Sequence, residues 1–222
     1  MTTPHDHDLP PLIEVRGLSL AREDEPIFGP LDFRLDGGAA LAIEGGNGAG
    51  KTTLIRVLAG LLAPSAGSVL WRGESWQTLE PAPGRIALLG HQLGLKPDLT
   101  PLEHLRFRAA LEGVRPGITP SAALRSVGLE GYEALPVRML SAGQRKRTAL
   151  AVLLLSTASL WLLDEPYANL DREGQVLVDR MIEAGVATQM SLKIISIQAK
   201  EGVAPGHEAS VGVACVAETS DQ

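Results

Sequence analysis

The segment GGNGAGKT at residues 45–52 limits the possible folds of this chain more than any other feature. It fits the pattern G-x-x-x-x-G-K-[ST], and it lies between a short apolar stretch, 39–44, and an amphipathic one. A glycine-rich loop between a buried strand and a helix lets backbone N–H groups surround a polyphosphate, and the helix N-terminus adds about half a unit of positive charge. The segment therefore predicts an α/β fold that binds nucleotide phosphates at this loop.

Residues of this loop have separate expected roles. The glycines let the backbone wrap the phosphates, Lys51 reaches the β- and γ-phosphates, and the Thr52 hydroxyl binds Mg²⁺. The predicted nucleotide-binding set here is Gly45, Gly46, Asn47, Gly48, Ala49, Gly50, Lys51, Thr52 and Thr53.

A second candidate part of the site is LWLLDEP at residues 160–166. Asp164 ends an apolar run that is typical of a buried strand, so it can hold Mg²⁺ through water beside Thr52. Glu165 lies one residue further, where a carboxylate can act as general base on the attacking water, an effect typically worth about 10²–10⁴-fold in rate. The alternative is two surface acids at a strand end.

Composition excludes several classes of protein. The chain has 222 residues, enough for one well-buried domain, and its net charge of −6 with no long basic run argues against nucleic acid as a partner. Cys215 is the only cysteine, which indicates a reducing compartment and no disulfide framework.

The longest uncharged run, 149–163, is shorter than the roughly 20 residues that cross a bilayer. The N-terminus is acidic and rich in proline, unlike a signal peptide, and we expect residues 1–11 to be disordered.

Alternation and turn residues predict the other elements. We expect antiparallel strands over 12–20 and 31–35 with a turn around Pro26–Pro30, and a helix over 53–63 that stops before Pro64. A further helix is expected over Arg172–Ala184. Further strands are expected over 68–71, 85–90, 192–197 and 211–216.

The region from 93 to 140 reads as a small helical lobe inserted in this core. Thr100 can cap a helix that begins at Pro101, with Glu103 placed to close a capping box. Thr119 and Pro120 repeat the cap and first turn. We therefore expect one domain over 1–222, with a core formed by 12–92 and 141–222 and the inserted lobe at 93–140.

The segment LSAGQRKRTAL at 140–150 raises a separate question, because it is a second glycine-containing helix start in a chain that already has a phosphate loop. Taken alone, Ser141 is an ordinary helix cap.

The order of motifs favours another interpretation: GGNGAGKT is followed by GHQ (90–92), LSAGQ (140–144), LLDEP (162–166) and NLD (169–171). This succession resembles the nucleotide-binding domain of ABC transporters up to about Ala184. The resemblance implies a RecA-like P-loop NTPase core with an N-terminal antiparallel β subdomain and an inserted helical subdomain, ATP and Mg²⁺ as cofactors, and ATP hydrolysis.

In that family two such domains face each other head to tail. The resemblance implies a homodimer in which Ser141, Gly143 and Gln144 contact the ATP held by the opposite subunit. Gln92 would lie at the hinge between core and lobe and would contact Mg²⁺ and the attacking water. Asp171 would lie along the dimer seam.

A finer resemblance is to the ATPases of the bacterial haem exporters of cytochrome c maturation. It rests on IEGGNGAGKTTLIRVLAGLL, LLGHQLGLKPDLTPLEHLRF and LSAGQRKRTALAVLLLSTASLWLLDEP. It implies a peripheral subunit at the cytoplasmic face of the inner membrane, bound to integral membrane permease subunits, with ATP use tied to haem delivery. A transporter of another substrate is the alternative, and the docking surface around Gln92–Arg108 would distinguish the two.

Two positions depart from the family pattern. Ile197 stands where the family has a histidine that contacts the γ-phosphate. Three explanations are open for this departure. The protein hydrolyses ATP slowly with Glu165 alone, it binds ATP with little turnover, or its C-terminus has been altered by a reading-frame error. The family also stacks an aromatic residue on adenine, whereas this chain offers only Arg22 nearby, which either stacks on the base or is solvated.

Overall fold

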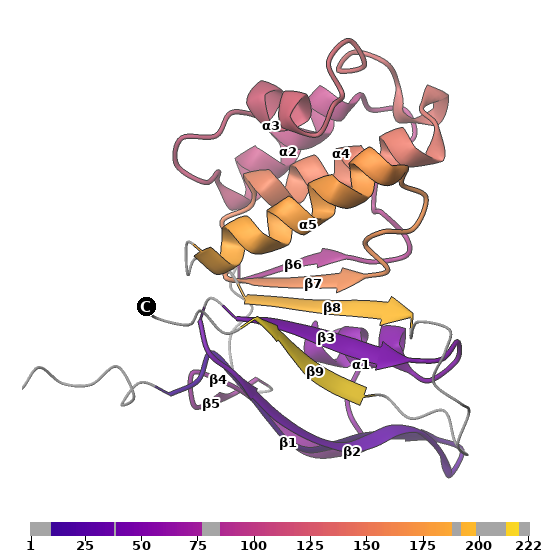
Figure 1. Cartoon of the computed structure of the whole chain (residues 1–222), viewed down its shortest axis with the longest axis vertical. Coiled ribbons are helices and arrows are strands. Elements are labelled where there is room, and N and C mark those ends of the chain that lie inside the picture. The colour runs from indigo at the N-terminus through magenta and orange to yellow at the C-terminus, as the bar shows by residue number, and fades with distance from the viewer. Residues whose placement is uncertain (1–9, 38, 77–84, 188–191, 199–211, 218–222) are drawn as a thin grey trace, which may run out of the picture.

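Two sheets and a helical layer form the molecule, seen in a computed structural model (Figure 1). A five-stranded sheet lies in the middle, helices cover one of its faces, and a four-stranded antiparallel sheet lies beyond the other face, with one helix between the two sheets. The described residues are 10–37, 39–76, 85–187, 192–198 and 212–217. This arrangement confirms the predicted α/β fold class with its separate antiparallel part.

The antiparallel sheet has the order β2-β1-β4-β5. Its strands are β1 Ile13–Arg22, β2 Glu25–Leu35, β4 Ala66–Trp71 and β5 Glu74–Ser75. The predicted turn around Pro26–Pro30 is wrong, because the chain turns at Glu23 and Asp24, which have φ angles of 53° and 66°. Both prolines lie inside β2, an edge strand, where proline is tolerated because only one side of the strand is paired.

The central sheet has the order β6-β7-β8-β3-β9. Its strands are β6 Ile86–Leu89, β7 Leu160–Asp164, β8 Leu192–Gln198, β3 Ala40–Gly45 and β9 Gly212–Ala217. The first four are parallel and β9 is antiparallel to β3. The carboxyl ends of β3 and β7, which carry the predicted phosphate and metal residues, therefore lie at one edge with β8 between them.

The helix α1, Lys51–Leu58, packs between the two sheets. It ends at Ala59 and Gly60, whose φ of 71° is the left-handed conformation that ends many helices, and not near Pro64 as predicted. The side chains of Leu61 and Leu62 are accordingly exposed.

The helical layer contains α2 Pro101–Glu112, α3 Pro120–Ser126, α4 Ala142–Leu155, α5 Arg172–Ala187 and a 3₁₀ turn, Val137–Met139. The Thr100–Glu103 capping box and the Thr119 cap are present as predicted. None of the helices that the structure describes is long and apolar enough to span a bilayer.

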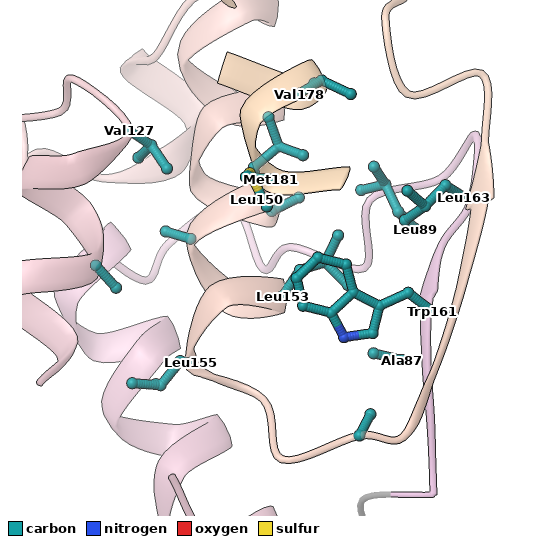
Figure 2. Close-up of a cluster of buried hydrophobic side chains, with 14 of the residues drawn as sticks. Ala87, Leu89, Val127, Leu150, Leu153, Leu155, Trp161, Leu163, Val178 and Met181 are labelled. Atoms are coloured by element: carbon teal, nitrogen blue, oxygen red, sulfur yellow. The ribbon is translucent and has the colours of Figure 1, made fainter. Parts of the chain in front are cut away.

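The strand β7 joins the two cores. Trp161 and Leu163 point into the core under the helices, where Trp161 packs beside Leu153 and Ala87 (Figure 2), while Leu160 and Leu162 enter the core around α1. Burial on both faces explains the uninterrupted apolar run before Asp164. The position of Asp164 is therefore fixed by rigid packing on either side.

Candidate nucleotide site

The phosphate loop is shaped by glycines in left-handed conformation. Gly48 has φ 81° and Gly50 has φ 89°. A Cβ atom on Gly50 would lie 2.8 Å from the carbonyl oxygen of Ile27 on β2, whereas a Cβ on Gly46 or Gly48 would meet open space. The loop is thus pressed against the antiparallel sheet on one side and open on the other, where a ligand can approach.

Lys51 begins α1 and is 7% exposed. Its Nζ donates hydrogen bonds of 2.7 Å to the carbonyl oxygens of Gly45 and Gly46. Gly50 supplies no side-chain cap to the helix. The loop therefore presents an ammonium group and the N–H groups of a helix N-terminus, a combination suited to polyphosphate.

Thr52 and Asp164 meet although 112 positions separate them in the chain. The Thr52 hydroxyl donates a hydrogen bond of 2.9 Å to Oδ2 of Asp164, which is 3% exposed at the end of β7. Hydroxyl and carboxylate oxygens are the hard ligands that Mg²⁺ prefers, and Mg²⁺ in such sites takes its remaining ligands from phosphates and water. No cluster of three His, Cys, Asp or Glu side chains occurs among the described residues.

Glu165 follows directly in a left-handed conformation, with φ 47°. Its carbonyl oxygen accepts a hydrogen bond of 2.9 Å from Nζ of Lys146, a residue of α4 that is 4% exposed. Burial lowers the pKa of Lys146, against the opposing influence of Asp164 and Glu165. These side chains line a cavity of about 200 Å³ together with His91, Leu93, Ala142, Arg145, Ala168 and Asn169.

The second glycine-containing helix start is capped within the chain. Oγ of Ser141 accepts a hydrogen bond from the Gln144 N–H at 3.1 Å, and Oε1 of Gln144 accepts one from the Ser141 N–H at 2.9 Å. A Cβ on Gly143 would lie 3.1 Å from the carbonyl oxygen of Asn169. Ser141 and Gln144 are therefore used by their own helix, and Gly143 lies against the segment after β7.

Asp171 has a local role in addition to its predicted one. Oδ1 accepts hydrogen bonds from the Gly174 N–H at 2.8 Å, which caps α5, and from Nη2 of Arg147 at 2.7 Å. The capping bond, followed by the bond to Arg147, keeps the pKa of Asp171 below its usual value.

Gln92 and Asp164 line different cavities. Gln92 lines a second cavity, of about 270 Å³, with His104 and Arg108 of α2, and the cavity beside Glu165 contains its neighbour His91 instead. Ile197 pairs in register with Glu44, one residue before the phosphate loop. Arg22 is exposed at the end of β1.

Lys146, Arg147 and His91 were not predicted as site residues. The available signal for the first two is the basic sequence RKR at 145–147, which interrupts the start of an otherwise apolar helix. A cation on the buried face of such a helix needs a partner, and here the partners lie in the segment after β7.

Known proteins share both the sequence pattern and the fold. The model of the ABC transporter family matches residues 28–168. The cytochrome c biogenesis ATP-binding export protein CcmA of Xanthomonas campestris is 56% identical over 178 residues, covering 80% of this chain and 83% of the relative. Proteins of the same name from Xylella fastidiosa and Methylococcus capsulatus are 49% and 46% identical, over 81% and 77% of this chain and 81% and 84% of their own lengths. A solved structure described as an ABC transporter (ATP-binding protein) from Pyrococcus furiosus aligns with a TM-score of 0.72 at 26% identity, over 85% of this chain and 92% of that one.

These similarities agree with the loop, the buried ammonium and the Thr52–Asp164 pair. They confirm that the chain binds nucleotide and is a transport ATPase. The chain belongs to the ABC transporter family, as an ATP-binding subunit.

Proposed function

We propose that this ATPase drives a haem exporter of cytochrome c biogenesis. The observation that carries the proposal is 56% identity, over four-fifths of the chain, to a cytochrome c biogenesis ATP-binding export protein. Relatives from three genera carry the same name. In this proposal ATP use is tied to haem delivery, and the chain itself need not bind haem.

The residues of the site divide the work of hydrolysis. Lys51 leaves the carbonyl oxygens of Gly45 and Gly46 to contact the β- and γ-phosphates. Thr52 and Asp164 would hold Mg²⁺, which would neutralise phosphate charge. Glu165 accepts a proton from water as the water oxygen forms a bond to the γ-phosphorus and the bond from that phosphorus to the ADP oxygen breaks.

Two copies of the chain complete each site in this proposal. Ser141, Gly143 and Gln144 approach the γ-phosphate held by the partner, and Asp171 lies along the seam between the copies. The capped geometry of Ser141 is compatible with this role, because a hydroxyl that accepts a bond from the Gln144 N–H still has its own hydrogen to donate to a phosphate oxygen. Gln92 reports the state of the nucleotide from the hinge.

Membrane permease subunits dock at the cavity that contains Gln92. This cavity lies between β6, α2 and α4, where the central sheet meets the helical layer. Nε of Arg108 is buried there without a hydrogen-bond partner in the described chain, and Phe107 and Leu111 are 56% and 58% exposed on the same helix. An apolar segment that also offers a hydrogen-bond acceptor suits this surface. In this proposal the chain is a peripheral subunit at the cytoplasmic face of the bacterial inner membrane.

The test is replacement of the gene by a Lys51→Ala version in the source bacterium. Because Lys51 is the buried cation of the phosphate loop, we expect c-type cytochromes to disappear from a gel stained for covalently bound haem, while apocytochrome persists in an immunoblot. The wild-type gene supplied on a plasmid is the control. If the variant strain contains c-type cytochromes in normal amounts, the ATPase must instead serve the export of another substrate.

A further inference from the structure

The start of α4 is joined to the segment after β7 by contacts that the proposed site does not use. Gly143 lies against the carbonyl of Asn169, Lys146 donates to the carbonyl of Glu165, and Arg147 donates to Asp171. Arg147 also donates a bond of 2.9 Å to the carbonyl of Val127, and its side chain is only 16% exposed. The segment 165–171 is thus held along its length by one helix.

Lys146 makes the contact closest to the chemistry. Glu165 has a left-handed backbone, a conformation that is unfavourable for a residue with a Cβ atom. Such a conformation persists only where the surroundings maintain it. The ammonium bond to the Glu165 carbonyl is charge-assisted, and such bonds are about twice as strong as neutral ones.

We propose that Lys146 is a positioning residue that orients Glu165 for its role as general base, through the hydrogen bond from its Nζ to the Glu165 carbonyl. The inference rests on the proposed role of Glu165. It also connects the two halves of the reaction, because α4 begins with the residues proposed to contact the partner's nucleotide. A shift of this helix start moves Lys146, and with it the base of its own site.

Lys146→Met is the first test, because methionine keeps the apolar stem and removes the donor. On the full-length protein we expect kcat for ATP hydrolysis to fall about ten- to a hundredfold, as a misplaced base would give, with KM for ATP changed less than twofold. Lys146→Arg restores a charged donor and is expected to recover most of kcat. If the methionine variant does not fold, Lys146→Leu, which also removes the donor, takes its place with the same expected loss.

Ser126→Ala is the matched control. It also removes a side-chain bond to a backbone carbonyl, that of Ala123 at 2.8 Å, but on α3 away from the site. We expect its kcat to be unchanged.

A double-mutant cycle with Glu165→Gln separates positioning from general destabilisation. If Lys146 acts through Glu165, the variant with both substitutions turns over as slowly as Glu165→Gln alone. Losses that multiply, or an unchanged kcat in Lys146→Met, would overturn the inference while leaving the proposed base intact. Full activity of Glu165→Gln itself would overturn the proposed base instead.

Discussion

The two glycine-containing helix starts of this protein, residues 45–52 and 140–144, look alike in sequence and differ in structure. Gly50 is left-handed and gives α1 no side-chain cap, so the first N–H groups of that helix face an open loop beside Lys51. Ser141 and Gln144 close a reciprocal capping box on α4. The first helix start leaves its backbone N–H donors free for a ligand, whereas the second pairs some of its N–H donors with its own side chains.

This difference shows why the chain can carry both. An uncapped helix N-terminus with a buried lysine binds an anion by itself, since the charge and the donors are in one place. A capped start with no lysine of its own at the phosphate position contributes fewer donors. It suits a role in which it completes a site that another phosphate loop has already formed.

The largest expected effect tests whether the second start reaches a nucleotide. In Glu165→Gln the amide cannot accept the water proton, so ATP turnover should fall by about 10²–10⁴-fold while ATP binding persists. Two chains should then remain associated around unhydrolysed Mg-ATP, which sedimentation velocity detects. Glu183→Gln, an exposed change on α5, serves as the control. If only single chains sediment, even with the membrane subunits present, the proposal that two chains form each site is wrong.

A pair of alanine variants sharpens the contrast between the glycines. Gly50→Ala places a Cβ 2.8 Å from the Ile27 carbonyl in a left-handed conformation, so we expect it to lose about 1–3 kcal/mol of unfolding free energy and to weaken ATP binding. Gly143→Ala lies inside a helix, where alanine is favoured, and needs only a small shift from Asn169. Urea titration of both variants measures the unfolding free energy, and nucleotide titration measures ATP binding. Equal losses in the two variants would mean that the two helix starts have the same function.

Ser141→Ala is expected to have a double, smaller effect. Loss of the cap costs about 1 kcal/mol of unfolding free energy, and loss of the donor to the partner's phosphate lowers turnover about tenfold. Thr119→Ala removes the cap of α3, a similar contact outside the site, and should show the stability loss alone. Identical turnover in the two variants would reduce Ser141 to a helix cap.

The smallest expected effect is at Ile197. Its backbone pairs with Glu44, next to the phosphate loop, so a histidine there could donate to the γ-phosphate. We expect Ile197→His to raise steady-state turnover by a few-fold, with Ile197→Leu as the matched control. A histidine variant no faster than wild type would show that this position does not limit hydrolysis.

Features with local causes were predictable. The capping box of Thr100 and Glu103 forms among residues three apart, and the phosphate loop forms between its own strand and helix. The turn placed at Pro26–Pro30 was wrong because proline is tolerated on an edge strand, and edge position depends on sheet order. The end of α1 at Gly60 was missed because the apolar residues that follow it suggested a longer helix.

Of the candidate site residues, Lys51, Thr52 and Asp164 were predicted from the sequence, because a motif fixes residue type and spacing within one segment. The sequence alone therefore determined the phosphate loop, the acidic pair after β7 and the family. Only the tertiary structure decided that Thr52, expected to share an ion with Asp164, donates a hydrogen bond directly to it, and that Lys146 holds Glu165. The physical reason is that these contacts depend on the order of parallel strands and on which face of α4 is buried, and neither is encoded in the spacing of residues along the chain.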